Sequence, residues 1–150
     1  MTEIFCLTAD HPLWVKTAGY AERCSWRAGK VLAKRMYSGS FKDFERVFAV
    51  FTDEAPAGFC TFTVNDALDE KYGLSPFIGF VFVGEEHRGN RLSEKMIRAA
   101  LRYADSIGFK KVYISSDEKG LYDKYGFTKL EGLFDTIYGT SEQLYAKETG

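Results

Sequence analysis

The sequence predicts a mixed α/β domain with a mostly antiparallel sheet of about six to seven strands and helices on both faces. Three observations support this fold class. Two apolar runs separated by a turn occupy residues 46–64, a strand at residues 77–83 is apolar throughout, and a long amphipathic helix starts at Leu92. A further strand at residues 111–115 follows that helix. Because strand, helix and strand alternate there, this part of the sheet is expected to contain a crossover with two parallel strands.

The first part of the chain is predicted to form one strand and two helices. Residues 3–8 alternate loosely as a strand, and Asp10, just before His11 and Pro12, is expected to be the N-cap of a helix. Gly29 is predicted to separate that helix from a second one carrying Val31, Leu32 and Met36, which ends at the cluster 38–40. The first helix is predicted because apolar residues recur at helical spacing, at Trp14, Ala18, Ala21 and Cys24.

The middle of the chain is predicted to form a β-hairpin and a buried strand. Residues 46–52 and 58–64 are rich in aromatic and β-branched residues, and the segment 53–56 between them is turn-like. After a polar connection over residues 65–76, the strand 77–83 is apolar on both faces. Such a pattern is typical of a central strand covered from both sides.

The last part of the chain begins with the strongest helical pattern. Gly108 ends this helix, whose apolar positions are Leu92, Met96, Ala99, Ala100, Tyr103 and Ile107. A strand at residues 111–115 follows, then a short helix around residues 119–124 that stops at Gly126. About two further strands are expected between Phe127 and Ala146.

Composition limits the classes of function. We expect residues 1–150 to form a single domain, since that length supports one well-formed core. The net charge of −1 offers no general attraction to nucleic acid or to an anionic membrane. The three cysteines, an odd number set among apolar neighbours, are expected to be reduced core thiols, and no spacing of Cys and His suggests a metal site. No signal peptide or spanning segment is apparent, so a cytoplasmic protein is expected.

The segment from Glu86 to Ser93 joins the buried strand to the long helix. A glycine-containing turn at such a place leaves backbone N–H groups unpaired at the positive end of the helix dipole, where phosphate binds readily. Gly89 allows close approach of a diphosphate, and Arg88 and Arg91 add positive charge. Neither a P-loop nor a G-x-G-x-x-G turn is present. Taken alone, the turn also fits a solvated basic loop.

The stretch from Val83 to Ser93 resembles signature A of the GNAT acetyltransferase superfamily, V-x-x-x-x-[QR]-x-x-G-x-[GA]. The resemblance implies that this turn cradles the pyrophosphate of acetyl-coenzyme A, with Arg88 at the [QR] position. Arg91 replaces the expected glycine, and Ser93 replaces the expected Gly or Ala. We interpret both replacements as tolerable, with the Arg91 guanidinium available to phosphate. The cofactor-binding residues implied here are Arg88, Gly89, Asn90, Arg91, Leu92 and Ser93.

A second stretch, Gly120 to Phe127, resembles the L-Y-E-K-x-G-F part of signature B of the same superfamily. The resemblance implies that Tyr122 protonates the departing thiolate of the coenzyme, although a packed aromatic side chain is the alternative interpretation. The asparagine often found just before this stretch is absent from residues 114–117. The family also implies a splayed central strand, whose backbone near Val81, Phe82 and Val83 holds the pantetheine arm and the acetyl oxygen.

The resemblance therefore implies an N-acetyltransferase that transfers acetyl from acetyl-coenzyme A to a primary amine of a small molecule or peptide by direct attack. A base is not identified: Glu85, Glu86, Asp117 or a water chain remain open. The acidic loop with Asp66, Asp69 and Glu70 either attracts a cationic amine or is plain surface. Alternatives are a different acyl donor, a hydroxyl acceptor, or a non-catalytic coenzyme A-binding module. No nucleic acid, membrane or metal is expected, and a homodimer remains open.

Overall fold

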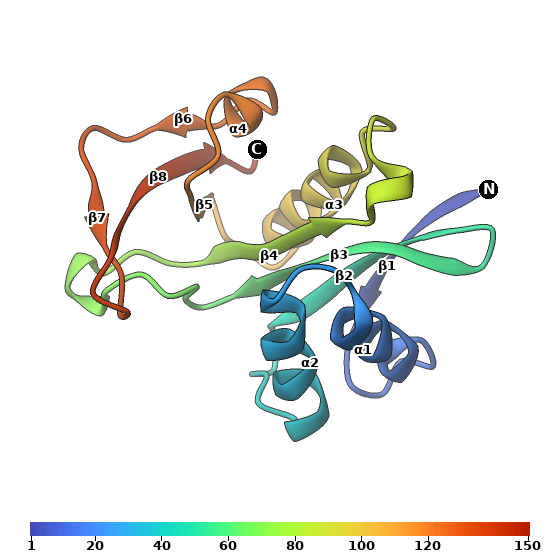
Figure 1. Ribbon diagram of the computed structural model, residues 1–150. Coiled ribbons are helices and arrows are strands. Elements are labelled where there is room, and N and C mark those ends of the chain that lie inside the picture. Colours follow the sequence, from blue (N-terminus) through green and yellow to red (C-terminus); the bar gives the residue numbers. More distant parts are fainter.

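Strand β4 (Phe77–Val83) lies in the middle of an eight-stranded sheet in the computed structural model, which describes residues 1–150 (Figure 1). The strand order is β1-β2-β3-β4-β5-β8-β6, and β7 pairs with β8. All neighbouring strands are antiparallel except β4 and β5. The other strands are β1 (Thr2–Leu7), β2 (Arg46–Thr52), β3 (Ala55–Thr63), β5 (Lys111–Ser116), β6 (Thr128–Lys129), β7 (Phe134–Asp135) and β8 (Ser141–Glu148). The predicted mixed, mostly antiparallel sheet is confirmed.

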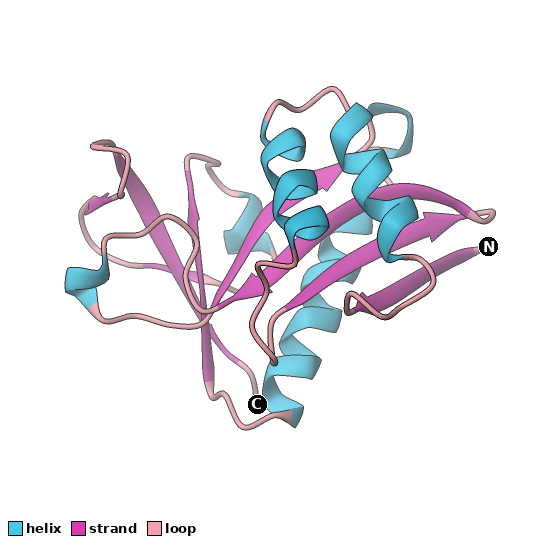
Figure 2. Cartoon of the chain, turned by 90° about the horizontal axis from the view of Figure 1, so that it is seen from below, coloured by secondary structure: helices cyan, strands magenta, loops and turns pink.

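Helices cover both faces of this sheet, as expected. Helices α1 (Trp14–Arg23) and α2 (Ala28–Ser38) lie side by side against one face, in front of the strands in Figure 2. Helix α3 (Leu92–Ser106) covers the opposite face and connects β4 to β5 as the crossover. The remaining helical segments are α4 (Leu121–Lys124) and the short 3₁₀ turns η1 (Glu70–Tyr72) and η2 (Glu85–His87).

The core consists of two layers separated by the sheet. Strand β2 is apolar from Val47 to Phe51 because both of its faces are covered. Phe48 and Val50 pack with α3, whereas Val47 and Ala49 pack with α1 and α2. Successive side chains of a strand point to opposite faces, so a sheet covered on both sides needs apolar residues at every position. The all-apolar strand β4 follows the same rule.

The start of the first helix differs from the prediction. Helix α1 begins at Trp14, its N-cap position is Leu13, and no side chain caps it, so the expected role of Asp10 as N-cap is wrong. Two turns intervene, since His11 N–H donates to Thr8 and Trp14 N–H donates to the carbonyl of His11. The His11 ring nitrogen Nδ1 accepts a hydrogen bond of 3.0 Å from Leu13 N–H.

Gly29 has a different role from the one predicted. It lies within α2 and does not separate the helices. A Cβ atom at this position would lie 2.3 Å from the carbonyl oxygen of Ala21 in α1. Glycine is therefore needed because the backbones of α1 and α2 approach closely there.

The first hairpin is tighter than the sequence suggested. Asp53 and Glu54 have positive φ angles of 50° and 69°, so a two-residue turn joins the strands and β3 already begins at Ala55. Positive φ at both central residues is typical of the turns whose twist matches a β-hairpin. The C-terminal part also holds three strands where about two were expected, because the two-residue strands β6 and β7 are too short to show a pattern.

The cysteines are all free, but they are not all core thiols as predicted. Cys60 is buried, Cys24 is half-buried and Cys6 is exposed. The difference follows from topology, because Cys6 belongs to β1 at the edge of the sheet. No group of His, Cys, Asp and Glu side chains is placed to hold a metal ion. None of the helices has the length and apolarity that crossing a bilayer requires.

Candidate active site

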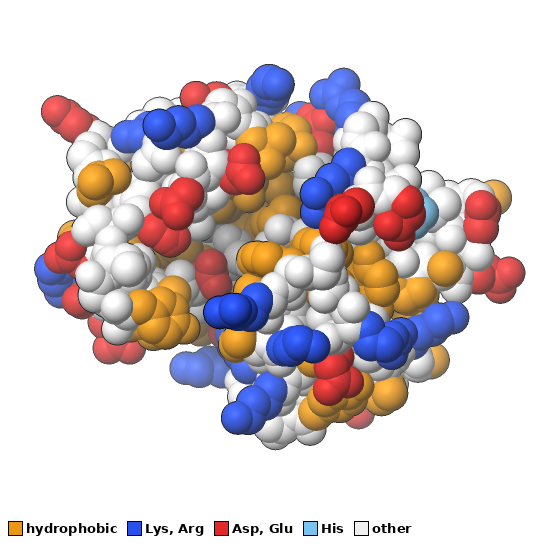
Figure 3. Space-filling view, in the orientation of Figure 1, with side chains coloured by type: hydrophobic (Ala, Val, Ile, Leu, Met, Phe, Trp, Pro, Cys, Tyr) orange, Lys and Arg blue, Asp and Glu red, His pale blue; other side chains and the backbone are white.

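Strands β4 and β5 pair only where they begin. Phe77 is in register with Tyr113, whose N–H donates to the carbonyl of Pro76 at 3.0 Å, and no further pair forms along the two strands. Beyond this point the strands diverge (Figure 1), so the edge of β4 that faces β5 is left unpaired. Between them opens a cleft of about 1300 Å³, visible in Figure 3 as a hollow with a hydrophobic interior. The splayed central strand that the family resemblance implied is present.

A β-bulge bends β4 at the middle of the cleft. Phe82 pairs with Phe59 and Gly79 pairs with Thr61, so Phe80 and Val81 together face a single residue of β3. Phe80 has a φ angle of +49°, a conformation that costs energy for a residue with a β-carbon. At functional sites, β-bulges often change the direction of the strand and of its side chains. Here the bulge lies in the wall of the cleft.

The turn between β4 and α3 lines a second pocket of about 500 Å³ that adjoins the cleft. No backbone N–H from Gly89 to Glu94 donates to another backbone group, and α3 has no side-chain cap. Unpaired N–H groups and the helix dipole make such a place favourable for an anion. Arg91 has a φ angle of +61° and precedes the helix, which explains why glycine suits this position.

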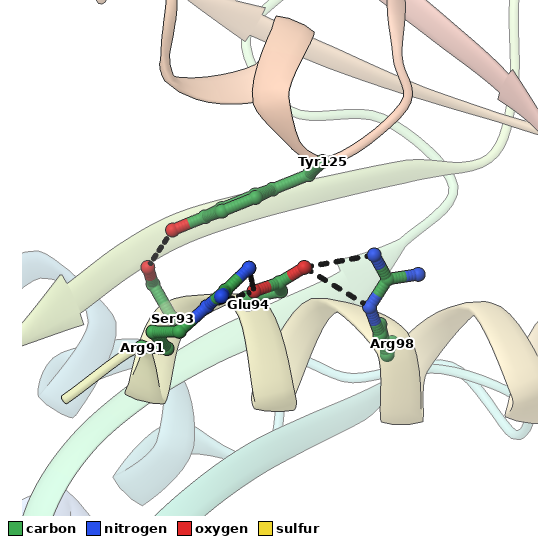
Figure 4. A network of polar contacts seen from close by, with 5 residues as sticks. All are labelled: Arg91, Ser93, Glu94, Arg98 and Tyr125. Atoms are coloured by element: carbon green, nitrogen blue, oxygen red, sulfur yellow. Dashed lines mark hydrogen bonds and ion pairs between the residues drawn. The ribbon is translucent and has the colours of Figure 1, made fainter.

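The cationic side chains of this turn have defined partners. Arg88 donates from Nε to the carbonyl of Val83 at 2.9 Å and lies 5.7 Å from the ring centroid of Phe82, at the junction of the two pockets. The guanidinium of Arg91 is paired with Glu94, with an N–O distance of 2.6 Å, so its charge is partly neutralised (Figure 4). Of the two, Arg88 is therefore better placed to meet a phosphate.

Ser93 does more than provide a small side chain. Its hydroxyl lies 2.7 Å from the hydroxyl of Tyr125 and forms a hydrogen bond between the start of α3 and the end of α4 (Figure 4). Glu94, the next residue, is also held by Arg98 at 2.8 Å, and its side chain is only 10% exposed. The Ser93–Tyr125 hydrogen bond thus joins two walls of the second pocket, whereas the Glu94–Arg98 pair lies within α3.

Tyr122 lies in the wall of the cleft opposite β4 and is 4% exposed. Its ring packs against Tyr125, Phe127 and Tyr145. Burial raises the pKa of the phenol well above its usual value, nearby Glu118 adds to the rise, and a hydrogen bond with Ser116 opposes it. The hydroxyl therefore stays protonated at neutral pH. The packing agrees with the packed-aromatic interpretation of Tyr122, and its place in the cleft wall leaves the acid role as a prediction.

The end of the cleft away from the turn has a different character. Trp26 stacks on Phe82 at 5.9 Å between ring centroids and contacts Phe80, which gives one wall an aromatic surface. Acidic side chains prevail around it, with Arg35 and Lys119 as the cations, and the acidic residues are Asp66, Asp117, Glu118 and Glu142. The pocket at the turn is instead lined by His87, Arg88, Arg91 and Lys124. The linings of the cleft and of the pocket at the turn thus differ in the sign of the charge that prevails.

Most of the residues predicted for the site converge on these two cavities. The cleft brings together Val81, Phe82, Val83, Arg88, Ser93 and Tyr122, and the adjoining pocket adds Gly89, Arg91 and Leu92. Asn90 lines neither cavity and donates to the carbonyl of His87 at 3.1 Å. Glu85 and Glu86 are exposed and do not line the cleft, whereas Asp117 does.

Sequence reasoning missed several cleft residues. Trp26, Gly79 and Glu142 come from three separate segments of the chain and belong to no motif. Asp66 was noted only as part of an acidic loop. The sequence does contain one signal for Asp66. Gly79 is the only small residue in a strand of bulky apolar residues, and a glycine inside a strand often marks the close approach of another group.

Comparisons with known proteins agree with this geometry. The model of the acetyltransferase (GNAT) family matches residues 10–127. A search among curated proteins by sequence found no match. Aminoglycoside 6'-acetyltransferase type Ii has a similar structure, with a TM-score of 0.75, 14% identity, and coverage of 99% of this chain and 97% of the other.

Two further solved structures show the same fold. Aminoglycoside 6'-N-acetyltransferase complexed with coenzyme A has a TM-score of 0.70 and 12% identity, over 99% of this chain and 97% of that one. The acetyltransferase of GNAT family from Streptococcus pneumoniae has a TM-score of 0.68 and 15% identity, over the whole of both chains. At these identities the likeness concerns the fold.

Proposed function

The chain belongs to the GNAT family of acetyltransferases, which use acetyl-coenzyme A, and on that premise we propose that it acetylates a cationic primary amine by direct attack. The observation that carries the proposal is the cleft between β4 and β5, which runs from a turn of unpaired N–H groups to an acidic end with Tyr122 in its wall. One end suits the anionic cofactor and the other a positively charged acceptor.

The cofactor would follow the cleft from the turn inward. Its diphosphate is assigned to the backbone N–H groups from Gly89 to Ser93, with Arg88 as the charged contact. Its pantetheine arm is assigned to the unpaired edge of β4 at Val81, Phe82 and Val83, where free backbone groups can pair with amides as a strand would. The thioester then reaches the bulge. Leu92 supports this arrangement from the core, whereas the partnered side chains of Asn90 and Arg91 contribute less to it.

Acetyl transfer from the thioester requires that the amine and the carbonyl carbon are held close together and that protons are transferred. Direct attack of a neutral amine on the carbonyl carbon forms the C–N bond, and collapse of the adduct breaks the C–S bond and releases a thiolate. Tyr122 is the proposed acid, since its hydroxyl is protonated and lies in the cleft wall. The burial that raises its pKa also raises the basicity of a thiolate formed beside it, so the two groups stay matched.

The proposal is tested by calorimetry with coenzyme A and by thiol release from acetyl-coenzyme A over an amine panel. The panel contains an aminoglycoside with a 6'-amino group, a linear polyamine and a lysine ester, because the acidic end of the cleft favours cationic acceptors. We expect binding together with amine-dependent thiol release. Binding without release on any amine would favour a non-catalytic coenzyme A-binding module, and release only with longer acyl donors or hydroxyl acceptors would favour those alternatives.

A further inference from the structure

Asp66 lies against the backbone of β4 beside the bulge. It belongs to the connection between β3 and β4, and a Cβ atom at Gly79 would lie 2.3 Å from its Cγ and 2.4 Å from its Oδ2. The absence of a side chain at Gly79 therefore makes the space that the Asp66 carboxylate fills. Gly79 directly precedes Phe80, so this carboxylate lies next to the point where β4 is re-aimed, and it lines the cleft.

The carboxylate of Asp66 is unusual in having no partner. It is half-buried, and no hydrogen bond or ion pair from the protein acts on it. Burial raises its pKa to about 6, Glu142 of β8 raises it further, and Arg35 of α2 opposes the rise. A shielded carboxylate is normally paired, so an unpaired one in a cleft indicates a group kept for a ligand.

Other acidic residues near the cleft are less suited to act at the bulge. Glu85 and Glu86 lie outside the cleft lining, and Asp117 and Glu118 are exposed after β5 on the opposite wall. Glu142 lines the cleft from β8, a strand that does not pair with β4. The side chains of β4 from Phe77 to Val83 carry no titratable group. A base for the attacking amine must therefore come from another segment, and the loop carrying Asp66 reaches β4 directly.

Resting on the proposed function, we propose that Asp66 is the base that takes a proton from the acceptor ammonium. Proton transfer from R–NH₃⁺ to the carboxylate leaves R–NH₂ and Asp66–COOH, and the amine lone pair then attacks the thioester carbonyl carbon. When the C–S bond breaks, the thiolate gains a proton from Tyr122, which regains one from the nitrogen of the adduct. Asp66 finally releases its proton to solvent, so the products are the amide, the free thiol and one proton.

This role also explains the acidic end of the cleft. An ionised carboxylate that lacks a protein partner can bind an ammonium group, and a base is most effective when its pKa lies near the working pH. The nearby Glu142 favours a positively charged acceptor over a neutral one. Gly79 is the positioning residue, because it permits the carboxylate to touch the strand.

Asp66→Asn tests the proposal, with Asp66→Glu as the rescue variant and Asp69→Asn as the control. Asp69 lies in the same loop, accepts from Lys71 N–H at 2.9 Å and does not line the cleft. Thiol release is measured from pH 5 to 9 with the aminoglycoside, the polyamine and the lysine ester, beside coenzyme A affinity and the melting temperature.

We expect Asp66→Asn to lower kcat/KM about 10²-fold or more and to remove an acid limb centred near pH 6, with unchanged coenzyme A affinity. Its melting temperature at pH 7.5 should not fall, because the substitution removes a buried charge. Asp66→Glu should restore part of the activity, and Asp69→Asn should match the wild type. Gly79→Ala, which displaces the carboxylate without changing its charge, should reproduce the loss.

The outcomes separate this role from the proposed function. A wild type that acetylates an amine, with an Asp66→Asn variant of equal rate and equal pH profile, overturns the role of Asp66 alone. A wild type that binds coenzyme A and acetylates none of the three amines contradicts the proposed function and the role of Asp66 together.

Discussion

Removal of the Tyr122 hydroxyl is a direct test of how the thiolate leaves. The ring of Tyr122 is packed among Tyr125, Phe127 and Tyr145, and a phenylalanine keeps all of these contacts. Phenylalanine removes only the hydroxyl, which lies near Ser116, so the free energy of unfolding should fall by no more than about 1 kcal/mol. Tyr122→Phe should therefore fold and bind coenzyme A nearly as the wild type does.

Turnover should respond much more strongly than stability. General acid catalysis contributes roughly 10²- to 10⁴-fold, so the variant should lose about 3–5 kcal/mol of transition-state stabilisation. Single-turnover thiol release with acetyl-coenzyme A and a reactive amine measures this loss, and calorimetry measures coenzyme A affinity. The lower turnover of the variant should persist from pH 6 to 9, because the raised pKa keeps the wild-type phenol protonated throughout that range.

Tyr145→Phe is the matched control. Tyr145 is buried, its ring lies 5.6 Å from that of Tyr122, and its hydroxyl donates to the carbonyl of Glu118 at 3.0 Å. It does not line the cleft, so its variant should keep the wild-type rate while losing a comparable amount of stability. Equal rates for Tyr122→Phe and the wild type would refute the acid role and leave Tyr122 as a packing residue.

Three further changes probe the site and its support. Gly89→Ala should weaken coenzyme A binding several-fold in calorimetry, since the φ angle of +90° at this turn strains a residue with a β-carbon; unchanged affinity would contradict the placement of the diphosphate. Gly29→Ala should lower the free energy of unfolding by about 1–3 kcal/mol in denaturant titrations, because its Cβ would meet the carbonyl of Ala21, and a neutral effect would show that α1 and α2 can separate freely. Glu94→Gln should lower the melting temperature near neutral pH, because hydrogen bonds from its two arginine partners hold the Glu94 pKa below its usual value. The ionised Glu94 therefore stabilises the folded protein fully above about pH 4.3, and this stabilisation is lost as the pH falls through the lowered pKa. The difference from the wild type should then narrow in acid, and a gap that stays constant to pH 3 would argue against the ion pairs.

Much of the fold was predictable because periodicity reports burial. Strand β4 and helix α3 were located from their apolar patterns, and the splayed strand followed from the family resemblance. Boundaries were less predictable where single contacts decide them. The start of α1 depends on turns around His11, and Gly29 depends on the approach of another helix, so neither leaves a signal in the local pattern.

The cofactor end of the site was easier to predict than the acceptor end for a physical reason. The proposed diphosphate site is a continuous turn from Arg88 to Ser93, and a continuous segment can carry a motif. The acceptor end is assembled from Trp26, Asp66 and Glu142, which come together only through the tertiary structure. The ion pair of Arg91 with Glu94 has the i,i+3 spacing of a helical pair, so the sequence offered a signal for it that the motif comparison did not use.

A structure of the protein with coenzyme A tests the proposed path of the cofactor. We expect the diphosphate against the backbone N–H groups from Gly89 to Ser93, the pantetheine arm along the free edge of β4, and the thiol between the bulge at Phe80 and the hydroxyl of Tyr122. Diphosphate bound away from this turn, or a thiol that ends outside the cleft between β4 and β5, would contradict it.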